Sequence, residues 1–88
     1  MTDRVALVTG STSGIGKAVV ERFVSDGLKV VINSVSSVDA GRAMVAEFGE
    51  DKAHYVQGDI AADGDAQRLV EETIARFGRL DVLVNNAG

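Results

Sequence analysis

The apolar residues of this chain fall into two patterns: short continuous runs, and longer stretches in which they recur every three or four positions. The runs occupy residues 4–9, 28–33, 53–57 and 81–84. A strand that is covered on both faces has a nearly continuous apolar sequence, because neither face meets water. The four runs therefore predict four strands of a largely buried sheet.

The stretches between the runs have helical periodicity and lie at residues 15–24, 40–48 and 66–77. In each, apolar side chains share one face and charged side chains mostly occupy the other, as in a helix that packs on a core. Ser37 or Asp39 is placed to cap the second of these helices, and Asp63 the third. Each helix is followed by a glycine that can end it in the left-handed conformation: Gly27, Gly49 and Gly78.

Strands and helices therefore alternate along the chain. Strands that alternate with helices of about 10 to 15 residues imply right-handed crossovers and a parallel sheet. The expected order of the four strands, numbered along the chain, is 3-2-1-4, with helices on both faces. Open sheets of this kind bind ligands at the carboxyl ends of the strands, where the order reverses. Here that point lies between the first and the fourth strand.

Composition narrows the class of protein. The 88 residues suffice for one small domain, and 45% apolar with 25% charged residues is typical of a globular protein. A net charge of −4 argues against a nucleic-acid surface, which needs a basic patch. Without cysteine there is neither a disulfide framework nor a thiolate metal site. No secretion signal is evident and no apolar run approaches the roughly 20 residues that span a bilayer, so we predict no membrane contact and a cytoplasmic location.

Glycines cluster between the first predicted strand and the first predicted helix, at Gly10, Gly14 and Gly16. Glycine permits a sharp turn and a close approach of the backbone to a ligand, because it has no Cβ. The N-terminus of the following helix offers unpaired N–H groups and a positive dipole end, which attract phosphate. The turn therefore predicts a pyrophosphate cradle for a dinucleotide, although its spacing, G-x-x-x-G-x-G, differs from the common G-x-G-x-x-G.

The alternative for this turn is a flexible loop without a ligand. Its position distinguishes the two interpretations. The turn follows the first strand, and residues 85–88 follow the fourth, so both lie at the carboxyl ends of the strands beside the switch point. This convergence favours the cradle.

Three separated motifs give the chain a resemblance to a known family. Residues 9–16 match a TGxxxGIG turn, Asp59 corresponds to an aspartate after the third strand, and residues 85–88 match NNAG. With these motifs the chain resembles the N-terminal half of the short-chain dehydrogenase/reductase family. The resemblance implies a Rossmann-like, three-layer α/β fold in which residues 1–88 form a partial dinucleotide-binding domain, with NADP or NAD as the cofactor.

The resemblance also implies which residues contact the cofactor. Asp59 would accept a hydrogen bond from the adenine amino group, with Ile60 near the ring. The glycine turn would pass under the pyrophosphate, and the segment after the fourth strand would border the adenosine ribose. The residues of these two segments are Gly10, Ser11, Thr12, Ser13, Gly14, Ile15, Gly16, Asn86, Ala87 and Gly88. The alternative is that Asp59, Asn85 and Asn86 only form turns.

The end of the second strand distinguishes NAD from NADP in folds of this kind. An acidic residue there binds the ribose 2′-hydroxyl and excludes a 2′-phosphate, whereas an arginine nearby accommodates the phosphate. Residues 33–37 contain neither, and Ser34 is the residue that we expect to contact the ribose or its phosphate. The missing acid favours NADP slightly over NAD.

The resemblance implies catalysis by a serine and by a tyrosine followed four residues later by a lysine, all beyond the NNAG motif. The one tyrosine here is Tyr55, and the residue four positions later is Asp59. We therefore predict no catalytic residue in this chain, which resembles the cofactor-binding half of an NAD(P)-dependent oxidoreductase. His54 and the acidic residues of 63–72 are interpreted as surface or strand positions, with no metal site.

A second hypothesis is non-enzymatic: an inactive half-fold that binds nucleotide weakly or assembles with itself. In the complete fold of the family a fifth strand would cover the outer side of the fourth. Without it, residues 81–84 leave an apolar edge, which is a template for pairing. We expect a homodimer or larger assembly through this edge or through neighbouring helix faces, with strands antiparallel across a two-fold axis.

Overall fold

The four strands and three helices that the sequence predicts are present in the computed structural model, which describes residues 3–86. The strands are β1 (Val5–Val8), β2 (Lys29–Ser34), β3 (Ala53–Gln57) and β4 (Val82–Val84). The helices are α1 (Gly14–Ser25), α2 (Val38–Phe48) and α3 (Asp65–Phe77). Each element lies within two residues of its predicted bounds.

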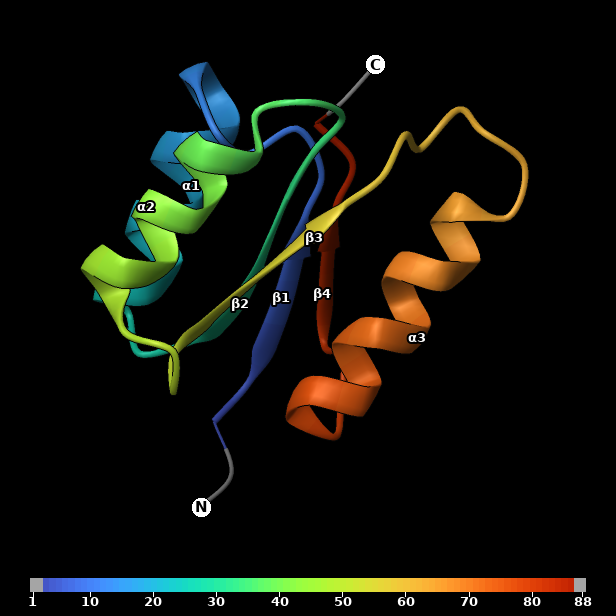
Figure 1. Ribbon diagram of the computed structural model, residues 1–88. Helices are drawn as coiled ribbons and strands as arrows, with labels where there is room; N and C mark the ends of the chain where they lie inside the picture. Colours follow the sequence, from blue (N-terminus) through green and yellow to red (C-terminus); the bar gives the residue numbers. More distant parts are fainter. Residues whose placement is uncertain (1–2, 87–88) are drawn as a thin grey trace.

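The strands form one parallel sheet in the order β3-β2-β1-β4, as predicted. Helices α1 and α2 cover one face of the sheet and α3 covers the other (Figure 1). This arrangement confirms the three-layer, Rossmann-like α/β fold. In residues 3–86, no helix combines the length and the apolar character that crossing a bilayer requires.

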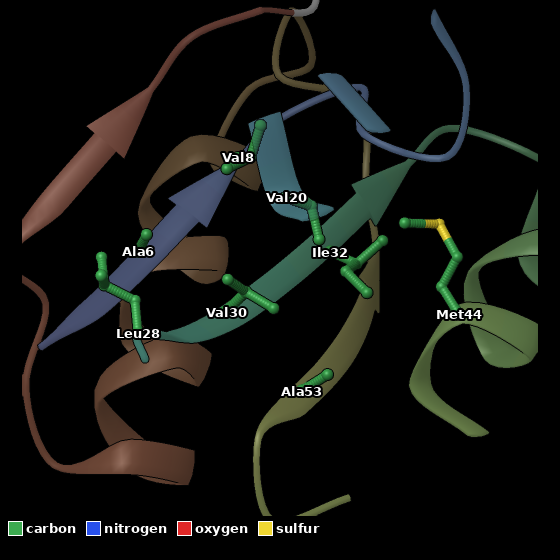
Figure 2. Packing of buried hydrophobic residues seen from close by; sticks show 8 residues of the cluster. All are labelled: Ala6, Val8, Val20, Leu28, Val30, Ile32, Met44 and Ala53. Atoms are coloured by element: carbon green, nitrogen blue, oxygen red, sulfur yellow. The ribbon is translucent and has the colours of Figure 1, made fainter. Parts of the chain in front are cut away.

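The two central strands, β1 and β2, are buried on both faces of the sheet, and their successive side chains point to opposite sides. On the α3 face, Leu7 and Val31 pack with Leu69. The cluster under α1 and α2 is shown in Figure 2 and contains Ala6, Val8, Val20, Leu28, Val30, Ile32, Met44 and Ala53. Burial on two sides is the reason why the sequences of β1 and β2 read as continuous apolar runs, whereas Leu83 in the apolar run of β4 is exposed.

Two details of the helix and strand ends differ from the predictions. The predicted cap of α3 is wrong: its N-cap is Gly64 and not Asp63, because the chain enters the helix through a left-handed residue with a φ of 82° that glycine adopts without strain. Strand β2 also runs one residue further than expected. The Ser34 carbonyl accepts a hydrogen bond from the Gly58 N–H (3.0 Å), which extends the ladder between β2 and β3.

Candidate functional site

The glycine turn connects β1 to α1 at the carboxyl end of the sheet. Gly10 and Gly14 have φ values of 59° and 58°, in the left-handed region that side chains rarely adopt. A Cβ atom built on Gly14 would meet no heavy atom within 4 Å. The backbone therefore requires glycine at position 14, and the outer side of this peptide faces open space.

Gly16, in contrast to Gly14, has other atoms packed closely around it. A Cβ atom built there would lie 2.5 Å from the Gly10 carbonyl oxygen, 2.7 Å from the Asn86 Nδ2 and 2.9 Å from the Ser11 Cα. Helix α1 can approach the turn this closely only because Gly16 lacks a side chain. Gly16 is therefore a packing residue that brings the start of the helix against the turn.

Helix α1 begins at Gly14, within the residues of the glycine turn. Ser13 is the N-cap residue, with extended backbone (φ −156°), and its side chain makes no cap hydrogen bond. The first turn of α1 contains no acidic residue, and Ser13, Gly14 and Ile15 are exposed. The N–H groups at the start of a helix have no partner within the helix and carry its positive dipole end. This end is therefore open to an anion.

The segment after β4 lies directly beside the turn, as predicted. The Asn86 N–H donates a hydrogen bond to the Thr9 Oγ1 (3.0 Å), and the Asn86 Nδ2 donates to the Gly10 carbonyl (3.0 Å). The Thr9 N–H donates to the Val84 carbonyl (3.0 Å). Asn86 therefore braces the turn from the fourth strand. The predicted residues Ala87 and Gly88 lie outside the described residues.

Asn33 is a site residue that the sequence analysis missed. It lies next to last in β2, is 1% exposed, and its Oδ1 accepts a hydrogen bond from the Gly10 N–H (3.1 Å). The signal in the sequence was a carboxamide at the end of an apolar run, where a buried polar group needs partners. Those partners are far away along the chain and could not be identified from the sequence.

Ser34 ends β2, where the cofactor ribose was expected. Its side chain is buried, and the Ser34 Oγ lies 2.5 Å from the Tyr55 hydroxyl of β3. The Tyr55 ring in turn packs against Gly41 of α2. Among residues 3–86, the side chains that meet at Ser34 are therefore two hydroxyl groups, with no carboxylate bonded to either of them.

The predicted adenine contacts, Asp59 and Ile60, follow β3. One Asp59 carboxylate oxygen accepts a hydrogen bond from the Ala61 N–H (2.9 Å), as in an Asx turn, and the Asp59 N–H donates to the Asp65 carboxylate (2.9 Å). Ile60 is half-buried and packs against the core cluster on the α3 face. Both residues thus have structural partners, and their contact with adenine stays a prediction.

The remaining ionisable candidates lie apart from the turn. Burial lowers the pKa of His54, the Arg76 charge acts in the same direction, and Glu72 opposes it. Glu72 forms an ion pair with Arg68 (2.7 Å) within α3, and Arg68 also donates to the Gln57 carbonyl of β3 (2.6 Å). Within residues 3–86, no group of three or more His, Cys, Asp or Glu side chains could hold a metal ion.

The grooves on the described surface include an apolar one and a more polar one. An apolar groove of about 480 Å³ runs along α1 and is lined by Ile15, Ala18, Val19, Arg22 and Phe23. A more polar groove of about 430 Å³ lies beside the edge strand β3 and is lined by Arg42, Val45, Ala46, Glu50, His54 and Tyr55. The first adjoins the glycine turn through Ile15, which is 77% exposed, and the second contains none of the predicted cofactor residues.

Known proteins are similar to this chain in sequence and in fold. The family model of the short chain dehydrogenases matches residues 4–88. A Streptomyces violaceoruber protein named as ketoacyl reductase 2 of the granaticin polyketide synthase is 50% identical over 84 residues, which are 96% of this chain and 33% of that protein. The 3-oxoacyl-acyl-carrier-protein reductase of Synechocystis sp. is 43% identical over 90 residues, and the match covers 100% of this chain and 36% of that protein.

Among solved structures, a blue fluorescent protein from a metagenomic library, in complex with NADPH, is similar to this chain with a TM-score of 0.91. The two sequences are 37% identical, and the alignment covers 99% of this chain and 37% of that one. This chain therefore spans about a third of the length of the relatives that it matches.

Proposed function

The chain belongs to the short chain dehydrogenase family, and from this premise we propose that it forms the dinucleotide-binding part of an NAD(P)-dependent oxidoreductase. The complete protein would transfer a hydride between the nicotinamide and an alcohol or carbonyl substrate. The observation that carries the proposal is the turn between β1 and α1, where the Gly14 peptide faces open space beside an exposed helix N-terminus. The bound dinucleotide would supply the hydride chemistry, which no residue of this chain provides.

The residues of the turn fit a pyrophosphate in size and in charge. The open side of Gly14 leaves room for a phosphate against the backbone, and the N–H groups of the first turn of α1 are suitable donors. Residues 9–17 carry one ionisable side chain, that of Lys17, so no carboxylate repels the phosphate. Asn86, braced against Gly10, would border the adenosine ribose.

For the choice of cofactor we propose a preference for NADP over NAD. The support comes from the end of β2, where the neutral hydroxyl groups of Ser34 and Tyr55 stand in place of a carboxylate. A carboxylate at this position would repel a 2′-phosphate, whereas the hydroxyl that accepts the bond within this pair keeps its own hydrogen to donate to the phosphate. The solved relative in complex with NADPH is consistent with this preference.

Replacing Gly14 by valine tests the cradle. The valine side chain would fill the open space over the turn, and we expect the affinity for NADPH, measured by titration calorimetry, to fall at least about tenfold, which is about 1.4 kcal/mol. The parent chain should bind NADPH more tightly than NADH. Since valine is also strained at a φ of 58°, the folded fraction must be measured in parallel by circular dichroism.

The control is Gly27→Val at the far end of α1. Gly27 also has positive φ (90°) and open space around a built Cβ, so valine there causes comparable backbone strain without approaching the turn. We expect Gly27→Val to lose stability and to keep its affinity for NADPH. Failure of the parent chain to bind either dinucleotide, or equal affinity losses in the two variants, would contradict the proposed cradle.

A second proposal, that the chain self-associates, is supported by the surface around β4. Within residues 3–86, β4 pairs with β1 alone, so its other edge carries unpaired backbone groups. Leu83 of β4 is 54% exposed and Ile74 of α3 is 47% exposed. The apolar groove along α1 is a further apolar surface, on the face of the sheet opposite α3. An open strand edge with exposed apolar side chains is a template for pairing with a second copy.

Sedimentation of the chain over a range of concentrations tests this proposal. We expect a reversible dimer, and we expect Leu83→Lys to shift it to the monomer, because a charge would then be buried beside the paired edges. Val35→Lys is the matched control, since Val35 is 55% exposed but lies in the loop between β2 and α2. A parent chain that stays monomeric at high concentration excludes self-association. The predicted cytoplasmic location stays a prediction.

A further inference from the structure

Asn33 is a buried polar side chain between three segments of the site. It lies at the carboxyl end of β2, with β1 on one side and β3 on the other. Its neighbours in the strand, Val30, Val31 and Ile32, are all fully buried and apolar. Burying a carboxamide among such residues costs free energy unless its hydrogen bonds are made. The Asn33 carboxamide therefore needs hydrogen-bond partners within the fold.

The side chain of Asn33 connects the glycine turn to the end of β3. The Asn33 Oδ1 accepts from the Gly10 N–H at 3.1 Å. The Asn33 Nδ2 donates both of its hydrogens, one to the Val56 carbonyl (3.0 Å) and one to the Gly58 carbonyl (3.1 Å). Three of the four hydrogen-bonding capacities of the carboxamide are thus used, each with a backbone group.

The backbone of Asn33 makes two further bonds to the same turn. Its N–H donates to the Ser11 Oγ (3.0 Å), and its carbonyl accepts from the Ser11 N–H (2.8 Å). Ser11 is fully buried, so its hydroxyl is not available to a ligand on the surface. Residues 10 and 11 are therefore held through Asn33, while residues 13–15 remain exposed.

Gly10 is held from two sides. Asn33 binds its N–H, and Asn86 binds its carbonyl at 3.0 Å. Gly10 has the left-handed φ of 59° from which the turn begins. Without the Asn33 side chain, the Gly10 N–H would lose its bond to Oδ1, and the Gly10 peptide would keep the bond from Asn86 to its carbonyl.

We propose that Asn33 is a positioning residue of the cofactor site, whose side-chain amide holds the Gly10 peptide in the left-handed turn and thereby sets the affinity of the turn for the dinucleotide pyrophosphate. The inference deepens the proposed function and rests on it for the identity of the ligand. It does not place Asn33 in contact with the ligand. Asn33 acts through Gly10 and Ser11.

The test compares two variants of Asn33 with a control in the 88-residue chain. Asn33→Ala and Asn33→Val each remove all three side-chain bonds, and valine keeps a branched side chain that suits a strand. Thr73→Ala is the control, because Thr73 is fully buried and its hydroxyl donates to the Leu69 carbonyl (2.7 Å) in α3, away from the turn. All three variants are expected to lower Tm.

The first readout is the affinity for NADPH by calorimetry, at a temperature at which each variant is folded. Both Asn33 variants should bind at least about tenfold more weakly, and Thr73→Ala should stay within about twofold of the parent. Equal affinity losses in the Asn33 variants and the control would reduce Asn33 to a residue that only stabilises the fold. Unchanged affinity in the Asn33 variants would likewise overturn the proposal.

The second readout needs no cofactor and separates this inference from the proposed function. Hydrogen exchange of the Gly10 amide should become at least about tenfold faster in both Asn33 variants, relative to the Leu7 amide in the core of β1, and should not in Thr73→Ala. If the parent chain binds no dinucleotide, the proposed function fails and the exchange of Gly10 alone decides the role of Asn33. An unchanged exchange rate then overturns it.

Discussion

Replacing Gly16 by alanine is expected to lower Tm by about 10 °C and to weaken NADPH binding at least about tenfold. The new Cβ would lie 2.5 Å from the Gly10 carbonyl oxygen and 2.9 Å from the Ser11 Cα, both backbone atoms that cannot rotate away. It would also displace the Asn86 amide, 2.7 Å away, from its bond to Gly10. Overpacking of this kind costs about 1–3 kcal/mol.

Whether Gly16→Ala lowers or raises the stability of the domain tests the packing of α1 on the turn. Gly16 has no positive φ, and in a helix without steric conflict alanine is more stable than glycine by about 0.5–1 kcal/mol. A stabilised Gly16→Ala variant would therefore show that α1 does not pack on the turn as described. Gly64→Ala is the control: it introduces left-handed strain (φ 82°) with no contact within 4 Å, and NADPH affinity should remain unchanged.

Replacing Gly41 by alanine should destabilise the domain by about 2 kcal/mol, measured by urea unfolding. Gly41 is buried in α2, and a Cβ atom there would overlap the Cδ1, Cε1 and Cγ atoms of the Tyr55 ring. The ring has little room to move, because the Tyr55 hydroxyl is tied to the Ser34 Oγ of β2. The absence of a side chain at Gly41 is thus what lets α2 lie against β3.

A double-mutant cycle tests whether the Tyr55 ring causes the destabilisation by Gly41→Ala. Tyr55→Ala removes the ring, so Gly41→Ala in the Tyr55→Ala background should cost nothing or stabilise the helix by about 0.5–1 kcal/mol. The coupling energy between the two positions should therefore reach about 2–3 kcal/mol. Additive effects, with the same loss in both backgrounds, would mean that the alanine at position 41 meets something other than the Tyr55 ring.

The features of the site that depend on short segments of sequence were predictable. Glycines at positions 10, 14 and 16 are visible in the sequence, and the structure gives two of them a left-handed φ and the third a tight contact. The approach of Asn86 to the turn followed from the predicted strand order, because parallel strands present their carboxyl ends at one edge. The predicted cap at Asp63 is wrong, because Gly64 starts the helix by backbone geometry that no side-chain preference reveals.

The partners of buried polar side chains were not predictable. Asn33 bonds with Gly10 and Gly58, and Ser34 bonds with Tyr55, across separations of more than 20 residues. A carboxamide or hydroxyl can bond with many groups, and its residue type does not say which of them the fold brings near. The same holds for Gly41, whose neighbour Tyr55 comes from another element.

The sequence by itself determined the order of strands and helices, the parallel sheet and the place of the glycine turn. These depend on the spacing of apolar side chains and on the conformational freedom of glycine, which are properties of short segments. Only the tertiary structure decided that Asn33 and Asn86 hold Gly10 from two sides and that Gly16 admits no side chain. Such contacts depend on distances between elements, which arise when the layers pack together.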